Sequence, residues 1–303
     1  MTPPDDFDPE IGVAETLEPG LRRIVAPNPS PMTYRGTNTY LVGHTDLAVV
    51  DPGPDSDAHL AAILASVGPA QEITHIIVTH AHLDHAPLSR RLSRHTGAPV
   101  HAFGDARAGR SAAMQALAAR GYDGGGEGID HEFAPDTTVA DGDMIAGSDW
   151  ALEVLHTPGH LGNHICLGYG DACLTADHVM GWASSLVSPP DGDLTDFMAS
   201  CARLAARQWR VFYPGHGAPV TDPHERLRWL IAHRNAREAA ILAELAKGPA
   251  SAAALARAIY VDTPPALWPA ATRNVLAHLI DLMGKSRVAP AAEVSEETPF
   301  SLT

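Results

Sequence analysis

The amino-acid sequence predicts an α/β fold with a smaller helical part at the C-terminal end. Three observations lead to this prediction: short apolar runs that are typical of buried strands, helical segments that alternate with them, and a length of 303 residues, which exceeds one ordinary domain. We expect two unequal domains, at residues 1–221 and 222–303.

The N-terminal part alternates strands and helices in chain order. Apolar runs at residues 21–25, 39–42 and 47–50 predict three successive strands. A helix is expected over residues 56–66, and the apolar run at residues 73–78 predicts the strand that follows it.

The next segments are less regular. Residues 86–96 predict a helix, and the alanine-rich residues 106–120 predict another. The glycine-rich residues 121–128 lack both the Gly-Lys-Ser/Thr ending and the preceding strand of a phosphate-binding loop. We therefore interpret them as a flexible connector.

A dense group of polar residues follows the strand predicted at residues 73–78. His80 and His82 are two positions apart, so in extended backbone their side chains leave the same face of the chain. Asp84 and His85 lie beyond them, where the chain must turn, and can point to a second position. The segment can thus serve two metal ions, although a polar surface loop is an alternative in a chain with 17 histidines.

Three further candidates weaken that alternative, because each follows an apolar run and lies beside turn residues. They are His160, Asp177 and His216, and proline or glycine next to His160 and His216 lets the backbone bend close to an ion. Seven candidate metal ligands result: His80, His82, Asp84, His85, His160, Asp177 and His216.

Imidazole and carboxylate ligands suit zinc, and also iron or manganese. Zinc can lower the pKa of bound water to about 7, so a hydroxide between two zinc ions would attack a carbonyl carbon or a phosphorus at neutral pH. No serine or cysteine nucleophile is needed. Asp84 is the candidate catalytic residue, which would orient the hydroxide and pass on its proton.

These motifs occur in a familiar order. HxHxDH at residues 80–85, TPGH at 157–160, Asp177 after a strand and PGHG at 214–217 resemble the signature of the metallo-β-lactamase superfamily. The resemblance covers roughly residues 20–220. It implies a four-layer αβ/βα sandwich with a two-metal site at one edge.

The resemblance also implies a role for each ligand. His80, His82 and His160 would hold the first metal ion, Asp84, His85 and His216 the second, and Asp177 would bridge the two. Asp51 would support the metal-binding loop from behind.

One branch of the superfamily is especially similar. Residues 28–33, 36–43, 233–238 and 259–264 resemble the β-lactamase-like protein 2 group, whose C-terminal part forms a small winged-helix-like domain. Asp177 stands where the best-known β-lactamases have cysteine, so antibiotic hydrolysis is not the expected main activity.

Hydrolysis of a small thioester or ester, or of a phosphodiester, is the leading hypothesis. Cleavage of single-stranded RNA is the alternative, because the resembled group includes endoribonucleases. A mono-iron persulfide dioxygenase is a less favoured hypothesis, since seven ligands exceed the needs of one ion.

Four residues are candidate substrate contacts. Trp182 lies in the apolar loop of residues 181–192, which we expect to line the cleft, although it could instead be a lid packed on the core or on another subunit of a homodimer. His164 could donate a hydrogen bond to the transition state or could pack behind the ligands. Tyr34 and Asn38 are candidates by resemblance.

The charge of the chain disfavours a nucleic-acid substrate. There are 21 Lys and Arg against 36 Asp and Glu, a net charge of −15. The richest basic stretch contains Arg226, Arg228, Arg234 and Arg237, which we interpret as the solvated face of an amphipathic helix.

Other features indicate a cytoplasmic protein without a membrane partner. The apolar runs are too short to cross a bilayer, and residues 1–10 are acidic and unlike a secretory signal. Cys166, Cys173 and Cys201 are expected to be core residues in a reducing compartment.

The C-terminal part predicts three helices, at about residues 223–246, 251–258 and 269–283, with Asp222 capping the first. No set of base-reading side chains stands out, so we do not expect DNA binding. Residues after 290 are expected to be frayed.

Overall fold

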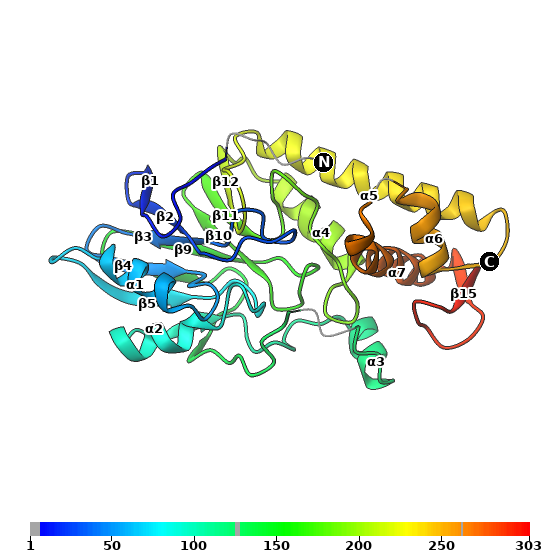
Figure 1. Cartoon of the computed structure of the whole chain (residues 1–303), viewed down its shortest axis with the longest axis horizontal. Coiled ribbons are helices and arrows are strands. Elements are labelled where there is room, and N and C mark those ends of the chain that lie inside the picture. Colours follow the sequence, from blue (N-terminus) through cyan, green and yellow to red (C-terminus); the bar gives the residue numbers. More distant parts are fainter. Residues whose placement is uncertain (1–6, 125–127, 262) are drawn as a thin grey trace.

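Two β-sheets pack face to face, and helices cover the outer face of each (Figure 1). The computed structural model describes residues 7–124, 128–261 and 263–303. Residues 1–6, within the acidic N-terminus, residues 125–127, within the glycine-rich connector, and Asp262 lie outside this description.

The first sheet has seven strands in chain order. They are β1 (Glu15–Glu18), β2 (Leu21–Val25), β3 (Asn38–Val42), β4 (Asp46–Val50), β5 (Glu72–Ile77), β6 (Val100–Ala102) and β7 (Thr137–Thr138). The second sheet has the order β12-β11-β10-β9-β8. Its strands are β8 (Met144–Ala146), β9 (Ala151–His156), β10 (Ile165–Tyr169), β11 (Ala172–Ala176) and β12 (Val211–Pro214).

Alternating side chains of one strand enter two different cores. On β4, Leu47 and Val49 pack with helices α1 (Asp57–Ala65) and α2 (Leu88–Thr96), whereas Ala48 and Val50 pack between the two sheets. Because both faces are covered, the strand is apolar throughout.

The second sheet follows the same rule. Leu167 and Leu174 face the space between the sheets, while Cys166 and Cys173 face helices α4 (Leu194–Ala205) and α5 (Pro223–Leu245). The predicted four-layer sandwich is confirmed. All three cysteines are free and buried, as predicted.

Strand direction brings the candidate ligands to one edge. Strands β4 and β5 are parallel, so Asp51 and the segment after β5 emerge at the same edge of the first sheet. Strands β11 and β12 are also parallel, so Asp177 and the segment with His216 emerge together from the second sheet. Strand β9 is antiparallel to β10, which is antiparallel to β11, and its end leads to His160 at this edge too.

Two helix predictions are confirmed, and one is corrected. Helices α1 and α2 match the expected segments, with Ser56 capping α1. Helix α3 (Ala112–Ala119) begins six residues later than position 106, because Gly109 adopts a φ of 72° and lies against the Gly162 carbonyl, where a Cβ atom would approach to 2.1 Å.

The C-terminal part gathers at one end of the molecule (Figure 1). It contains α5, α6 (Ala252–Ile259), a 3₁₀ turn η1 (Pro265–Leu267) and α7 (Trp268–Gly284). A small sheet joins β13 (Ala250–Ser251), β15 (Pro299–Leu302) and β14 (Val288–Pro290). The prediction of a frayed tail is wrong, because Phe300 on β15 is fully buried in the core of this part.

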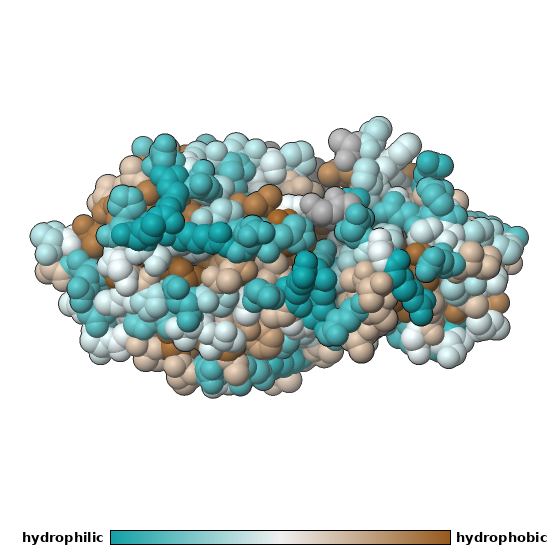
Figure 2. All heavy atoms as spheres, turned by 90° about the horizontal axis from the view of Figure 1, so that it is seen from below, coloured by the Kyte–Doolittle hydropathy of each residue, from teal (hydrophilic) through white to brown (hydrophobic). Residues whose placement is uncertain are grey.

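The surface is mainly hydrophilic on the face seen in Figure 2, and strongly hydrophilic side chains gather where α2 lies. Arg90, Arg94 and His95 on this helix are exposed. Within the described residues, no helix is both long and apolar enough to span a bilayer.

The N-cap of α5 generates a stability prediction. Asp222 accepts a hydrogen bond of 2.9 Å from the Glu225 amide, which has no partner in the first turn of the helix. We expect Asp222→Ala to lower the free energy of unfolding by about 1 kcal/mol. Asp222→Asn, which keeps the acceptor oxygen, should lose much less, as measured by urea unfolding. Equal losses in both variants would contradict the cap.

Candidate metal centre

All seven predicted ligands lie together at the edge shared by the two sheets. The ligand atoms form two groups, within each of which they lie no more than 4.8 Å apart. The first group is His80, His82, His160 and Asp177, and the second is Asp84, His85 and His216. This grouping agrees with the predicted division between two ions.

Ring nitrogens converge closely in the first group. Nδ1 of His82 lies 3.0 Å from Nε2 of His80 and 3.0 Å from Nε2 of His160. All three rings are substantially buried, and burial lowers the pKa of His82 to about 3. These imidazoles are therefore neutral at physiological pH, and neutral imidazole is the form that binds metals.

The second group combines two imidazoles with a carboxylate. Nε2 of His216 lies 3.1 Å from Oδ2 of Asp84 and 3.3 Å from Nε2 of His85. Burial by itself lowers the pKa of His216, but the carboxylates of Asp177 and Asp84 outweigh it and raise that pKa to about 10. The same negative charge attracts a metal cation.

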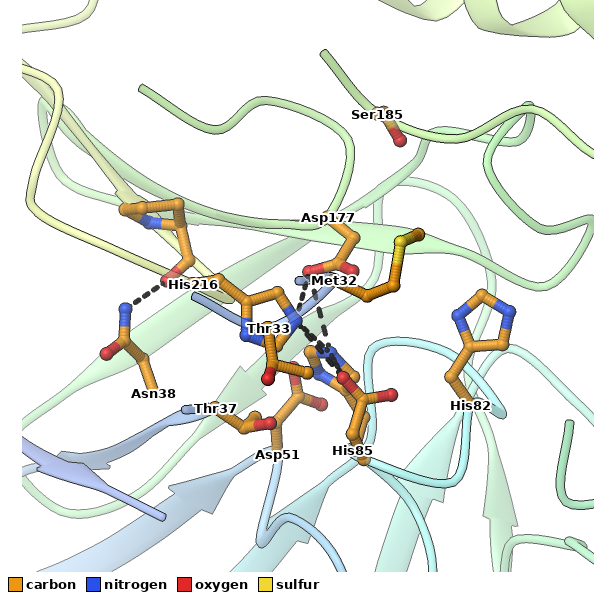
Figure 3. A network of polar contacts seen from close by, with 12 residues as sticks. Met32, Thr33, Thr37, Asn38, Asp51, His82, His85, Asp177, Ser185 and His216 are labelled. Atoms are coloured by element: carbon orange, nitrogen blue, oxygen red, sulfur yellow. Dashed lines mark hydrogen bonds and ion pairs between the residues drawn. The ribbon is translucent and has the colours of Figure 1, made fainter. Parts of the chain in front are cut away.

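Asp177 lies between the two groups (Figure 3). Its Oδ2 atom is 3.6 Å from Nε2 of His160, whereas its Oδ1 atom is 3.4 Å from Nε2 of His216 and 3.5 Å from Nε2 of His85. Oδ1 is buried and accepts no hydrogen bond from the described residues. One carboxylate thus presents one oxygen to each group.

Fixed hydrogen-bond acceptors decide which ring nitrogen of each histidine carries its proton. Nδ1 of His160 lies 2.7 Å from the Leu186 carbonyl, and Nδ1 of His216 lies 3.1 Å from the Gly36 carbonyl. A carbonyl oxygen only accepts, so Nδ1 is the donor in both rings. Nε2 therefore keeps a lone pair that points into the centre.

Asp51 imposes the same tautomer on two more histidines. Its Oδ2 atom accepts from Nδ1 of His85 at 2.9 Å and from Oγ1 of Thr79 at 2.7 Å. Because the Thr79 hydroxyl donates its hydrogen to Asp51, it accepts from Nδ1 of His80 at 2.9 Å. The supporting role expected for Asp51 is confirmed.

These observations fit a divalent metal centre. Lone pairs of neutral imidazoles face one another at about 3 Å, an arrangement that is repulsive unless a cation lies among them. Four of the five rings also donate their remaining N–H to an acceptor, as metal-bound histidines normally do.

A small pocket opens beside the first group. It is lined by His82, Gly124, Ile129, His160, Leu161, Leu186, Ser188 and Asp191. Three of these residues belong to the loop of residues 181–192, which was expected to line the cleft. Trp182 does not line this pocket but stacks on Tyr34, with ring centroids 5.3 Å apart. Substrate contact by Trp182 or Tyr34 remains a prediction.

Asn38 and His164 lie behind the ligands rather than in the pocket. Asn38 is fully buried, and its Nδ2 donates to the Pro214 and Gly217 carbonyls at 2.8 and 2.9 Å, on either side of His216. His164 is also fully buried, and its Nδ1 donates to Thr157 Oγ1 at 3.0 Å. Both placements favour a supporting role, and contact with substrate stays untested.

Backbone acceptors are the functional groups that sequence reasoning missed. The Leu186 and Gly36 carbonyls orient two ligands, yet any residue type can supply a carbonyl. The sequence carries no signal that could have identified them.

Gly215 generates a prediction about metal binding. A Cβ atom at this position would lie 2.3 Å from Oδ1 of Asp177 and 2.8 Å from Cε1 of His85. We expect Gly215→Ala to displace these side chains and to reduce the metal content of the purified protein by at least one ion per chain. Gly284→Ala, where a Cβ atom meets nothing within 4 Å, should bind metal normally. An unchanged metal content in Gly215→Ala would contradict the assigned geometry.

Comparisons with known proteins agree with this geometry. The family model of the metallo-beta-lactamase superfamily matches residues 32–230, and that of the beta-lactamase associated winged helix domain matches residues 251–294. The beta-lactamase-like protein 2 homolog of Drosophila melanogaster is 30% identical over 297 residues, which are 93% of this chain and 95% of the relative. An atrochrysone carboxyl ACP thioesterase of Claviceps purpurea is 26% identical over 79% of this chain and 69% of its own.

Solved structures show the same fold. A metallo-beta-lactamase family protein from Thermus thermophilus is 28% identical and superposes with a TM-score of 0.75, covering 95% of this chain and 100% of its own. A beta-lactamase domain protein from Burkholderia ambifaria, at 20% identity, superposes with a TM-score of 0.81, covering 99% of this chain and 96% of its own. The predicted resemblance to the β-lactamase-like protein 2 branch is confirmed, and the chain belongs to the metallo-beta-lactamase superfamily.

Proposed function

We propose that this chain is a hydrolase with two divalent metal ions, zinc in the first place, and that it cleaves a small thioester or ester. The observation that carries the proposal is Asp177, whose two carboxylate oxygens face different groups of histidines. The thioesterase named among the similar proteins supports the thioester, and a phosphodiester would suit the same centre.

The proposed ligands divide as the geometry suggests. His80, His82 and His160 would hold the first ion, Asp84, His85 and His216 the second, and Asp177 both. Two ions bound here would supply hydroxide at neutral pH and would stabilise the negative charge that develops on the substrate.

Asp84 has the position required of a proton acceptor. Its Oδ2 atom faces His216 and His85, at 3.1 and 3.4 Å. Oδ1 has no hydrogen-bond partner among the residues that the structure describes, and the side chain is 26% exposed, so this oxygen can accept a proton and release it to solvent. His85, held by Asp51, keeps Asp84 oriented during this transfer.

The pocket suggests where the acyl group lies. Ile129, Leu161 and Leu186 give it apolar walls next to His82 and His160. An apolar acyl group placed there would bring its carbonyl carbon near the first group of ligands.

The alternative of an RNA substrate receives less support. The interpretation of the basic stretch as a solvated helix face is wrong for two of its arginines. Arg226 donates to the Met180 and Ala183 carbonyls, each at 2.6 Å, and Arg234 is buried. Because these guanidinium groups serve the protein itself, they are not available to phosphates. The two groups of ligands likewise disfavour a mono-iron dioxygenase.

Metal analysis and a substrate panel test the proposal. We expect about two zinc ions per chain, loss of hydrolysis after chelation, and recovery when Zn²⁺ is added back. Thioester, lactone, phosphodiester and single-stranded RNA substrates should be assayed together, with the thioester turned over fastest. One iron per chain with oxygen consumption would overturn the proposal, and preferred cleavage of RNA would establish the alternative.

The role of Asp84 yields a separate prediction. Asp84→Asn keeps the shape of the side chain but removes its capacity to accept a proton, so kcat should fall by about 10²- to 10⁴-fold. Asp171→Asn, at an exposed aspartate paired with Arg210 far along the second sheet, serves as the control. Normal turnover by Asp84→Asn with a full metal content would rule out the proton-transfer role.

A further inference from the structure

The loop of residues 181–192 links the C-terminal helices to a ligand of the metal centre. Within this loop, the Leu186 carbonyl accepts the hydrogen bond of Nδ1 of His160 at 2.7 Å. This bond keeps Nε2 of His160 unprotonated and turned toward His82. The position of one backbone carbonyl therefore controls one ligand.

Residues on both sides of Leu186 are held from outside the sandwich. Arg234 on α5 donates through Nη2 to the Ser185 carbonyl. Asn274 on α7 accepts through Oδ1 from the Val187 amide at 3.1 Å and also from Nη1 of Arg234 at 3.0 Å. Arg234 and Asn274 thus form one hydrogen-bonded unit that fixes both peptide neighbours of Leu186.

Arg234 is an unusual residue to find at this depth. It is 2% exposed, and no carboxylate among the described residues forms an ion pair with it. Its guanidinium group instead contacts the Phe197 ring, 5.1 Å from the centroid, besides its two hydrogen bonds. Burying a charge without a counter-charge is costly, so packing alone does not explain an arginine here.

We propose that Arg234 and Asn274 are positioning residues for the first metal ion, acting through the Leu186 carbonyl and His160. The inference rests on the proposed two-metal function. It gives the C-terminal part a defined task, because α5 and α7 complete the outer hydrogen bonds of a ligand that comes from the sandwich. Such outer partners typically change metal affinity by about 10- to 100-fold when they are lost.

The test is a Zn²⁺ titration of the full-length, metal-stripped chain in competition with a chromophoric chelator. We expect Arg234→Met to weaken one of the two Zn²⁺ sites by about 10- to 100-fold and to leave the other site within about threefold. Asn274→Ala should weaken the same site. Asn274→Asp keeps an acceptor oxygen for both partners and should bind Zn²⁺ nearly as wild type does.

Two control variants separate positioning from general stability. Arg237→Met removes an arginine three positions further along α5, which contacts the Ile259 carbonyl and the Tyr260 ring but not the loop. Arg226→Met removes another contact between α5 and the loop, at Met180 and Ala183, away from Leu186. Both should retain two Zn²⁺ sites of wild-type affinity, whatever their melting temperatures.

Two results would count against the inference, and they differ. Wild-type affinities at both sites in Arg234→Met and Asn274→Ala would overturn the positioning role while leaving the two-metal centre intact. A wild-type chain that binds fewer than two Zn²⁺ ions would overturn the proposed function and this inference with it. If Arg234→Met fails to fold, the comparison of Asn274→Ala with Asn274→Asp decides the matter.

Discussion

Each Nδ1–H group of four buried histidines donates to an acceptor that the fold holds in place, and the metal centre depends on these bonds. The acceptors are the Leu186 and Gly36 carbonyls, the Asp51 carboxylate and the Thr79 hydroxyl. With these protons placed outside, the Nε2 lone pairs point inward and converge. Without the acceptors, the rings could turn or exchange tautomers, and no common point for a cation would exist.

The two sheets make this convergence possible. Parallel pairing of β4 with β5, and of β11 with β12, places the ends of several strands at one edge. The packing between the sheets then fixes the distance across that edge, and Asp177 from one sheet meets His85 from the other. Gly215 is needed at the same place, because a side chain there would occupy the space of the Asp177 carboxylate.

Support for the centre also comes from the C-terminal part. Helices α5 and α7 contact the loop of residues 181–192, which lines the pocket and orients His160. In this arrangement substrate recognition and metal binding share one loop. A change in that loop would therefore affect both, which gives the winged-helix-like part a role in the chemistry without any contact with the reacting atoms.

The sequence by itself determined the kinds of ligands, their order and the strands that carry them, because strand ends and the two-residue spacing of His80 and His82 are local properties. Helices α1, α2 and α5 were predicted for the same reason, since caps and apolar periodicity are local. Only the tertiary structure decided the long-range features. The inward Arg234, the pairing of Phe300 in the small sheet and the backbone acceptor at Leu186 depend on segments far apart in the chain, and a carbonyl group has no residue type by which a sequence could announce it.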